Sequence, residues 1–186
     1  MNEGIDLFER SHRLQEELRL TREHYFVDDV LFTTQWWLLI VAFALAYALF
    51  VFSVDRRRLL PIAVVGLLVY GIAVTADQIG ADFLLWDYPK MLMPWGPRLL
   101  VANLIIPVGF MLTYQWFRGW RSYLIAVALL SALYAFAFEP LAQWTGVYAP
   151  LAWKPAYSWP IYIAIGAIAK QAADGAERAQ AKAVGR

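Results

Sequence analysis

The sequence predicts an all-α integral membrane protein, a bundle of five transmembrane helices preceded by an amphipathic helix outside the membrane. Composition is the first reason: 61% of the 186 residues are hydrophobic, 17% are charged and the mean hydropathy is +0.49, which is typical of membrane proteins. The second reason is that uncharged stretches near the length of a membrane span recur along the chain. Backbone groups in lipid must be paired within the segment, so we expect these stretches to be helices.

The residues present exclude several kinds of chemistry. The absence of Cys removes disulfides, thiol nucleophiles and metal–thiolate sites. Both histidines, His12 and His24, precede the first span, and no Gly-rich phosphate loop or zinc motif occurs. Asp77 and Asp82 would be about 140° apart around a helix, which disfavours a magnesium site shared with Glu139. We therefore expect no metal and no cofactor.

Residues 1–29 form the predicted amphipathic helix. Opposite charges recur four residues apart, and a thin apolar stripe consists of Leu7, Leu14, Leu18 and Tyr25. The segment is expected either to lean on the bundle as a solvated helix or to self-associate through the stripe. Acidic residues outnumber Arg here, which disfavours attraction to anionic lipid.

Five spans are expected within the transmembrane domain, residues 30–172, near 30–54, 59–76, 99–117, 122–138 and 155–169. The second must continue past Asp77 and the fourth past Glu139 to cross a core of about 30 Å. The fifth can continue through Lys170, whose stem is expected to reach the headgroups. Residues 173–186 are predicted to be a frayed cytoplasmic tail.

The loops predict the orientation. The loop at 56–58, the loop at 118–121 and the C-terminal tail share one side and carry most of the Lys and Arg outside the N-terminal helix. The positive-inside rule therefore places the C-terminus in the cytoplasm and the N-terminus outside.

Polar residues converge at the outer end of this bundle. At about 1.5 Å per residue, Asp77 lies about 26 Å from the start of its span, and Glu139 reaches a similar height. Seven of the nine Trp are also expected on the outer side, whereas an ordinary aromatic belt occupies both interfaces. Two compatible interpretations stay open, an interfacial cap that seals the bundle and a ligand site. The candidate ligand-binding residues are Asp82, Trp86, Tyr88, Arg98, Asn103, Glu139, Trp144, Tyr148 and Trp153.

A carboxylate in hydrocarbon costs about 2.5–3.5 kcal/mol on insertion scales, so each acid needs a partner or a function. Asp77 is expected to hold helices together through Asn103, Arg98 or a Tyr hydroxyl, or to act as a proton donor. Glu139 precedes Pro140, where a helix bends or ends, and Lys154 or Arg98 could pair with it. Glu139 and Asp77 are the two candidate catalytic residues.

The second half of the chain resembles an uncharacterised family of small five-span membrane proteins of Gram-positive spore-forming bacteria. The resemblance covers roughly residues 60–170, and its marks are DQIGADFLLWDYP at 77–89, MLTYQ at 111–115, WRSY at 120–123, FEPL at 138–141 and YSWPIY at 157–162. An acid would be expected where this chain has Asn103. The resemblance implies the five-span fold, a bacterial plasma membrane and a site at the outer end, and it implies no activity.

A second and much weaker resemblance is to membrane-embedded lycopene cyclases. It rests on Asp77 followed by Trp86 and Tyr88, and the acidic pair of the following span in that family is missing here. This resemblance implies acids that protonate polyenes.

Three hypotheses for the function follow. The protein binds a lipid, isoprenoid or other amphipathic ligand at the outer end, or it is a membrane enzyme whose buried carboxylate donates a proton to such a molecule. In the third hypothesis it is a structural or partner-binding subunit whose acids only hold helices together. We expect membrane lipids, an amphipathic small molecule and a second copy of the chain as partners, and no nucleic acid.

Overall fold

The computed structural model describes residues 2–95 and 100–184, and it consists of helices, two strands of two residues each and the loops that connect them. The predicted all-α class is therefore confirmed. The elements are α1 (Asn2–Tyr25), η1 (Phe26–Val30), α2 (Thr34–Ser53), η2 (Arg56–Arg58), α3 (Leu59–Asp82), β1 (Trp86–Asp87), α4 (Leu100–Trp116), α5 (Trp120–Leu133), η3 (Tyr134–Phe138), α6 (Glu139–Trp144), β2 (Ala149–Pro150) and α7 (Pro155–Val184).

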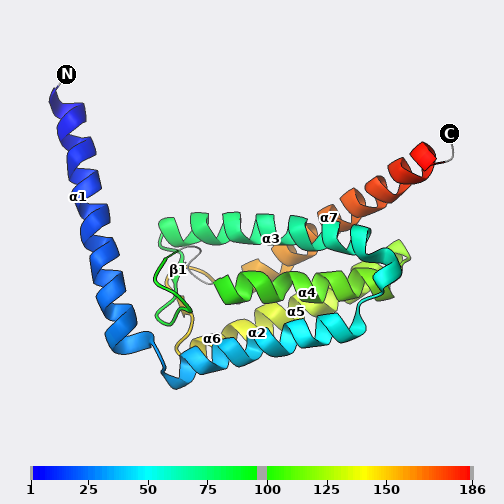
Figure 1. The fold of residues 1–186 in the computed structure, drawn as a ribbon, viewed down its shortest axis with the longest axis horizontal. Helices are drawn as coiled ribbons and strands as arrows, with labels where there is room; N and C mark the ends of the chain where they lie inside the picture. The colour runs from blue at the N-terminus through cyan, green and yellow to red at the C-terminus, as the bar shows by residue number, and fades with distance from the viewer. Residues whose placement is uncertain (1, 96–99, 185–186) are drawn as a thin grey trace.

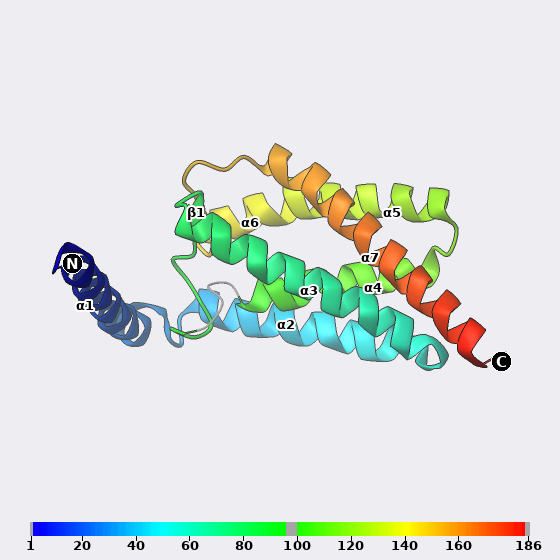
Figure 2. The ribbon, with the colours of Figure 1, turned by 90° about the horizontal axis from the view of Figure 1, so that it is seen from above.

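The helices from α2 to α7 run along one long axis, whereas α1 crosses this axis at one end of the bundle (Figures 1 and 2). Helix α3 packs on α4 and α7, α5 packs on α7, and α2 packs on α4. The main core lies between α3, α4, α5 and α7, and its largest fully buried side chains include Ile62, Phe110, Tyr114 and Tyr123. Helix α2 has no buried residue and lies at the edge of the bundle.

Local interactions fix the turn between α2 and α3. The Gln115 amide of α4 accepts from the backbone N–H of Asp55 at 2.7 Å and donates to the Ser53 carbonyl at 2.8 Å. The Asp55 carboxylate in turn accepts from the backbone N–H of Arg57 at 3.0 Å and so begins η2. These bonds satisfy backbone groups that a helix end leaves unpaired.

Three helical stretches among the described residues are long and apolar enough to cross a membrane: Thr34–Ser53, Arg56–Asp82 and Trp120–Trp144. The second and third run past Asp77 and through Glu139, as the sequence predicted. Large apolar side chains stand exposed around them, such as Leu67 at 71% and Leu129 at 68%. An exposed apolar surface of this kind requires lipid or another protein to cover it.

Lys170 does not reach the headgroups, and that prediction was wrong. Only 2% of the residue is exposed, and its ammonium group lies 4.9 Å from the ring centre of Tyr114, 5.3 Å from Trp120 and 5.1 Å from Tyr123. It pairs with Asp174 at 3.2 Å and donates to the Arg118 carbonyl at 3.0 Å. Aromatic faces and a carboxylate thus replace water around this cation. The tail beyond residue 172, which was expected to fray, continues α7 as a helix to Val184.

Candidate functional site

A small two-stranded cap covers the end of the bundle near α1 (Figure 1). We define the cap as residues 83–95 and 145–154. Strand β1 pairs antiparallel with β2, with Trp86 opposite Pro150 and Asp87 opposite Ala149. The carbonyl of Leu85 also accepts from two backbone N–H groups of the second loop, at 3.0 and 2.9 Å. The two loops therefore form one unit although about 60 residues separate them in the sequence.

Asp77 anchors this cap to the bundle. Asp77 is 7% exposed, and its carboxylate accepts three hydrogen bonds. Trp86 donates through Nε1 at 3.1 Å, Asn103 of α4 donates through Nδ2 at 3.1 Å, and the Tyr88 hydroxyl donates to the same oxygen as Trp86. Asn103 and a Tyr hydroxyl are two of the partners expected from the sequence. All three groups are donors, so both oxygens of Asp77 are occupied within the chain.

The backbone after Asp82 makes this arrangement possible. Helix α3 ends at Asp82, and Leu84 adopts a positive φ of 55°, which reverses the chain and returns Trp86 to α3. Gly80 leaves the space, because a Cβ there would lie 2.1 Å from the Trp86 ring. The residue that packs against Gly80 is therefore an indole of the cap.

Glu139, the other candidate acid, is half-buried and is the first residue of α6. The π-helical segment η3 precedes it and Pro140 follows it, and π-helical turns of this kind often occur at functional sites. The Tyr162 hydroxyl donates to Oε1 at 3.3 Å, and the Ser158 side chain neighbours the same carboxyl. The other oxygen, Oε2, is buried and has no hydrogen-bond partner among the described residues. Lys154, expected to pair with Glu139, is exposed.

Aromatic contacts connect the two acids. The Trp86 and Trp153 rings lie edge to face with centres 4.8 Å apart, and Trp153 Nε1 donates to Ser158 Oγ at 2.9 Å. The Tyr88 and Tyr148 rings pack with centres 5.7 Å apart. Both Tyr rings are buried with Val147 in a second, smaller apolar cluster under the cap.

The two cap tyrosines keep their phenolic protons at neutral pH. Burial, followed by the Asp77 carboxylate, raises the pKa of Tyr88 well above its usual value. Burial, followed by the Glu139 and Asp77 carboxylates, raises the pKa of Tyr148 in the same direction. Loss of either proton would place a phenolate beside existing carboxylates in a poorly solvated region.

The structure brings most of the predicted site residues together, and these are Asp77, Trp86, Tyr88, Asn103, Glu139, Tyr148 and Trp153. Trp144 does not belong to this group, because it is 83% exposed on α6. Asp82 is exposed as well and accepts from the Gln78 amide of its own helix at 2.9 Å. Asp82 and Trp86 do not share a helix face, because α3 ends at Asp82. Arg98 lies outside the described residues.

Ser158 is a site residue that the sequence reasoning missed. It stands four residues before Tyr162, so both side chains share one face of α7. The sequence signal for Ser158 was this four-residue spacing in the apolar helix that begins at Pro155. Across residues 2–95 and 100–184 the structure brings together no three His, Asp or Glu side chains that could hold a metal ion.

Three comparisons with known proteins complete the description of the site. No protein-family model, no curated protein and no solved structure matches this chain.

Proposed function

We propose that this chain is a five-span protein of the bacterial plasma membrane, and that it binds an amphipathic molecule such as a lipid or isoprenoid at its outer end. In this proposal Glu139 accepts a hydrogen bond from the polar head of the ligand. The resemblance of residues 60–170 to small five-span bacterial proteins supports the setting.

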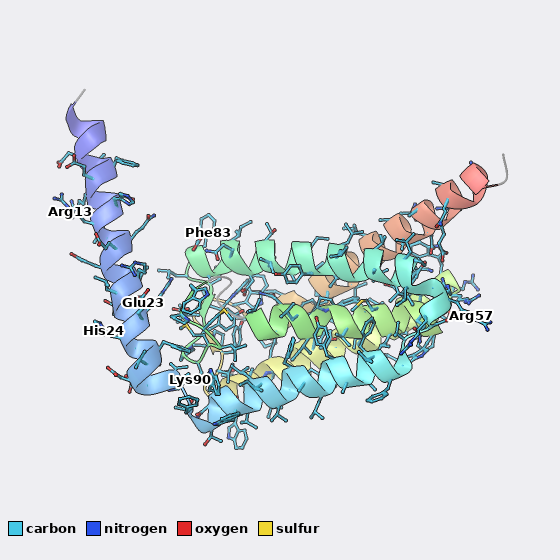
Figure 3. The ribbon with its side chains drawn as sticks, viewed as in Figure 1. Arg13, Glu23, His24, Arg57, Phe83 and Lys90 are labelled. Atoms are coloured by element: carbon cyan, nitrogen blue, oxygen red, sulfur yellow. The ribbon has the colours of Figure 1, made fainter. Side chains whose placement is uncertain are left out.

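Two further helices would complete the five spans. Helix α4 has 17 residues, and α7 has 30, of which the first half is apolar. Both lie alongside the three long apolar stretches (Figure 2), so a bilayer around those three would also surround α4 and the first half of α7. An odd number of spans puts the two termini on opposite sides. The Arg-rich turn at η2 then faces the cytoplasm, at the end opposite the cap, as Arg57 and Phe83 illustrate in Figure 3.

The observation that carries the ligand proposal is the buried and unpartnered Oε2 of Glu139. A buried polar atom without a partner costs about 1–3 kcal/mol, and buried acids near hydrocarbon usually serve a function. A hydroxyl or amine on a ligand would supply the missing donor. Asp77 has no unpartnered oxygen, because the chain itself supplies hydrogen bonds to both of its carboxylate oxygens. The structural role considered for both acids therefore suits Asp77.

The surroundings of Glu139 favour an amphipathic ligand over a water-soluble one. Phe136, Phe138 and Leu141 on the same helical stretch are 48–52% exposed, and Trp159 on α7 is 41% exposed. The cap closes the end of the bundle above them with buried Tyr88, Val147 and Tyr148. An acyl or prenyl chain could therefore lie against these exposed apolar side chains. Its polar head would then reach Glu139 from the side of the bundle and not through the cap.

Native mass spectrometry with lipid extraction tests the proposal on gently solubilised protein. The comparison uses wild type, Glu139→Gln and the control Asp28→Asn, which removes an exposed carboxylate at the same end. We expect a discrete bound species in wild type and in the control, reduced about 10- to 100-fold in Glu139→Gln, because hydrogen bonds to charged groups contribute about 1.5–3 kcal/mol. Bulk phospholipid alone in all three proteins, or full retention by Glu139→Gln, would contradict the proposal.

A further inference from the structure

Helix α1 contacts the rest of the chain near its C-terminal end. We call residues 25–30 its base, and the exposed residues 6–21 its shaft. At the base, Phe26 and Val30 are buried, the Tyr25 hydroxyl donates to the Pro89 carbonyl at 3.0 Å, and the Lys90 ammonium donates to the Asp29 carbonyl. Residues 6–21 are all exposed, and their side chains stand clear of the bundle (Figure 3). Because most helical stability in proteins comes from packing of an apolar face, a partner along the shaft would stabilise α1.

Three leucines of the shaft form one narrow stripe, and the exposed Phe8 lies outside it. Leu7, Leu14 and Leu18 are 66%, 56% and 46% exposed. At about 100° per residue they fall within about 40° of one another around the helix, and Tyr25 falls on the same line. Leu20, in contrast, lies on the opposite side. This stripe has the width of a coiled-coil seam and is narrower than the face of a helix that covers a core.

The charges on α1 argue against anionic lipid and for a second copy. Residues 2–25 carry six Asp or Glu and four Arg, so an anionic membrane surface would repel the helix. Arg10 and Glu17 lie on the same flank of the stripe, seven residues apart. When two such helices pack in opposite directions, the same flanks face each other, and Arg10 of each copy can lie against Glu17 of the other.

We propose that α1 pairs in the antiparallel direction with α1 of a second copy of this chain. The direction follows from the membrane placement proposed above. Copies inserted the same way are related by a two-fold axis along the membrane normal, which is the bundle axis. Because α1 runs across this axis, the operation reverses it. In the register that joins Arg10 to Glu17, Leu7 packs on Leu18 of the second copy.

Cysteine cross-linking in the native membrane tests the pairing, and the chain offers a clean background because it contains no Cys. Leu7→Cys and Leu18→Cys are made in separate copies with different tags and expressed together. We expect a disulfide between the two tagged copies. Neither variant alone should cross-link to itself, because equal positions lie about 16 Å apart in this register, whereas a disulfide requires Cα atoms within about 7 Å. Leu20→Cys with Leu7→Cys is the control.

A second measurement tests the charges. Glu17→Arg should lower the Leu7–Leu18 cross-link several-fold, and adding Arg10→Glu in the same chain should restore it. Absence of the Leu7–Leu18 cross-link in protein that is in the membrane fraction, or self-cross-linking of Leu7→Cys, would overturn antiparallel pairing. Either result leaves the ligand test at Glu139 unaffected, since residues 6–21 of α1 stand clear of the bundle that holds Glu139.

Discussion

At the scale of single residues, the two acids near the cap, Asp77 and Glu139, differ in how their oxygens are satisfied. Asp77 accepts from Trp86, Tyr88 and Asn103, whereas one oxygen of Glu139 has no partner among the described residues. The sequence placed both acids at the same end of the bundle. It could not separate their roles, because two of the Asp77 donors come from a loop whose path depends on tertiary contacts.

Asp77→Asn should loosen the cap. The substitution removes the charge that strengthens three hydrogen bonds, so we expect a loss of about 1.5–3 kcal/mol in unfolding free energy. Thermal unfolding in detergent, followed by Trp fluorescence, measures it. Asp28→Asn is the matched control and should change stability by no more than about 0.5 kcal/mol, because Asp28 is exposed. Equal losses in the two variants would contradict the anchoring role of Asp77.

The raised pKa of Tyr88 predicts a loss of stability in alkali. Because its pKa in the folded chain lies above the usual 10.0, the folded state holds the proton more tightly than the unfolded state does. The stabilisation is complete below about pH 10 and decreases as the pH rises above this value. We expect the melting temperature of wild type to fall between about pH 10 and 11, and less steeply in Tyr88→Phe. An unchanged slope in Tyr88→Phe would refute this, and the exposed Tyr157→Phe should retain the wild-type slope.

At the scale of elements, periodicity and charge located the helices well. The expected continuation past Asp77 and Glu139 is present in α3 and in the stretch from α5 to α6. The sequence predicted the cap only as an interfacial seal of the bundle, because the pairing of β1 with β2 is set by contacts between distant segments. Lys170 shows the same limit: its length suggested a headgroup contact, and three rings from α4 and α5 enclose it instead.

Two glycines of α3 offer a matched test of how Trp86 of the cap packs on this helix. A Cβ at Gly80 would lie 2.1 Å from the Trp86 ring, whereas a Cβ at Gly71 would meet nothing within 4 Å. Gly80→Ala should displace the indole and destabilise the fold by about 1–3 kcal/mol. Gly71→Ala should be neutral or stabilise by up to about 1 kcal/mol, since Ala is the better helix former. Thermal melts measure both effects, and equal melting of the two variants would show that Gly80 does not seat the cap.

At the scale of the whole molecule, charge is concentrated at the two ends and apolar side chains cover the length between them. The Arg-rich η2 turn lies at one end and the cap at the other (Figure 3). Composition and hydropathy predicted this layout directly. The across-axis direction of α1 was not predictable, because it depends on the η1 turn and on the contact of Tyr25 with Pro89.

Single cysteines in the Cys-free chain test the five-span topology in intact cells. A membrane-impermeant maleimide should label Lys154→Cys from outside, and Arg57→Cys only after the membrane is opened. Leu67→Cys, exposed in the middle of α3, should resist labelling in both conditions because lipid covers it. Labelling of Lys154→Cys and Arg57→Cys from the same side would contradict the proposed arrangement.

The most direct test of the central claim, that the outer end holds one acid for structure and one for a ligand, is reaction with a lipid-soluble carbodiimide. The reagent enters from hydrocarbon and modifies carboxyl groups with an available oxygen, and peptide mass spectrometry locates the adduct. The account predicts modification of Glu139 and protection of Asp77, whose oxygens accept three internal hydrogen bonds. Modification of Asp77 with Glu139 unmodified, or equal modification of both, would contradict it.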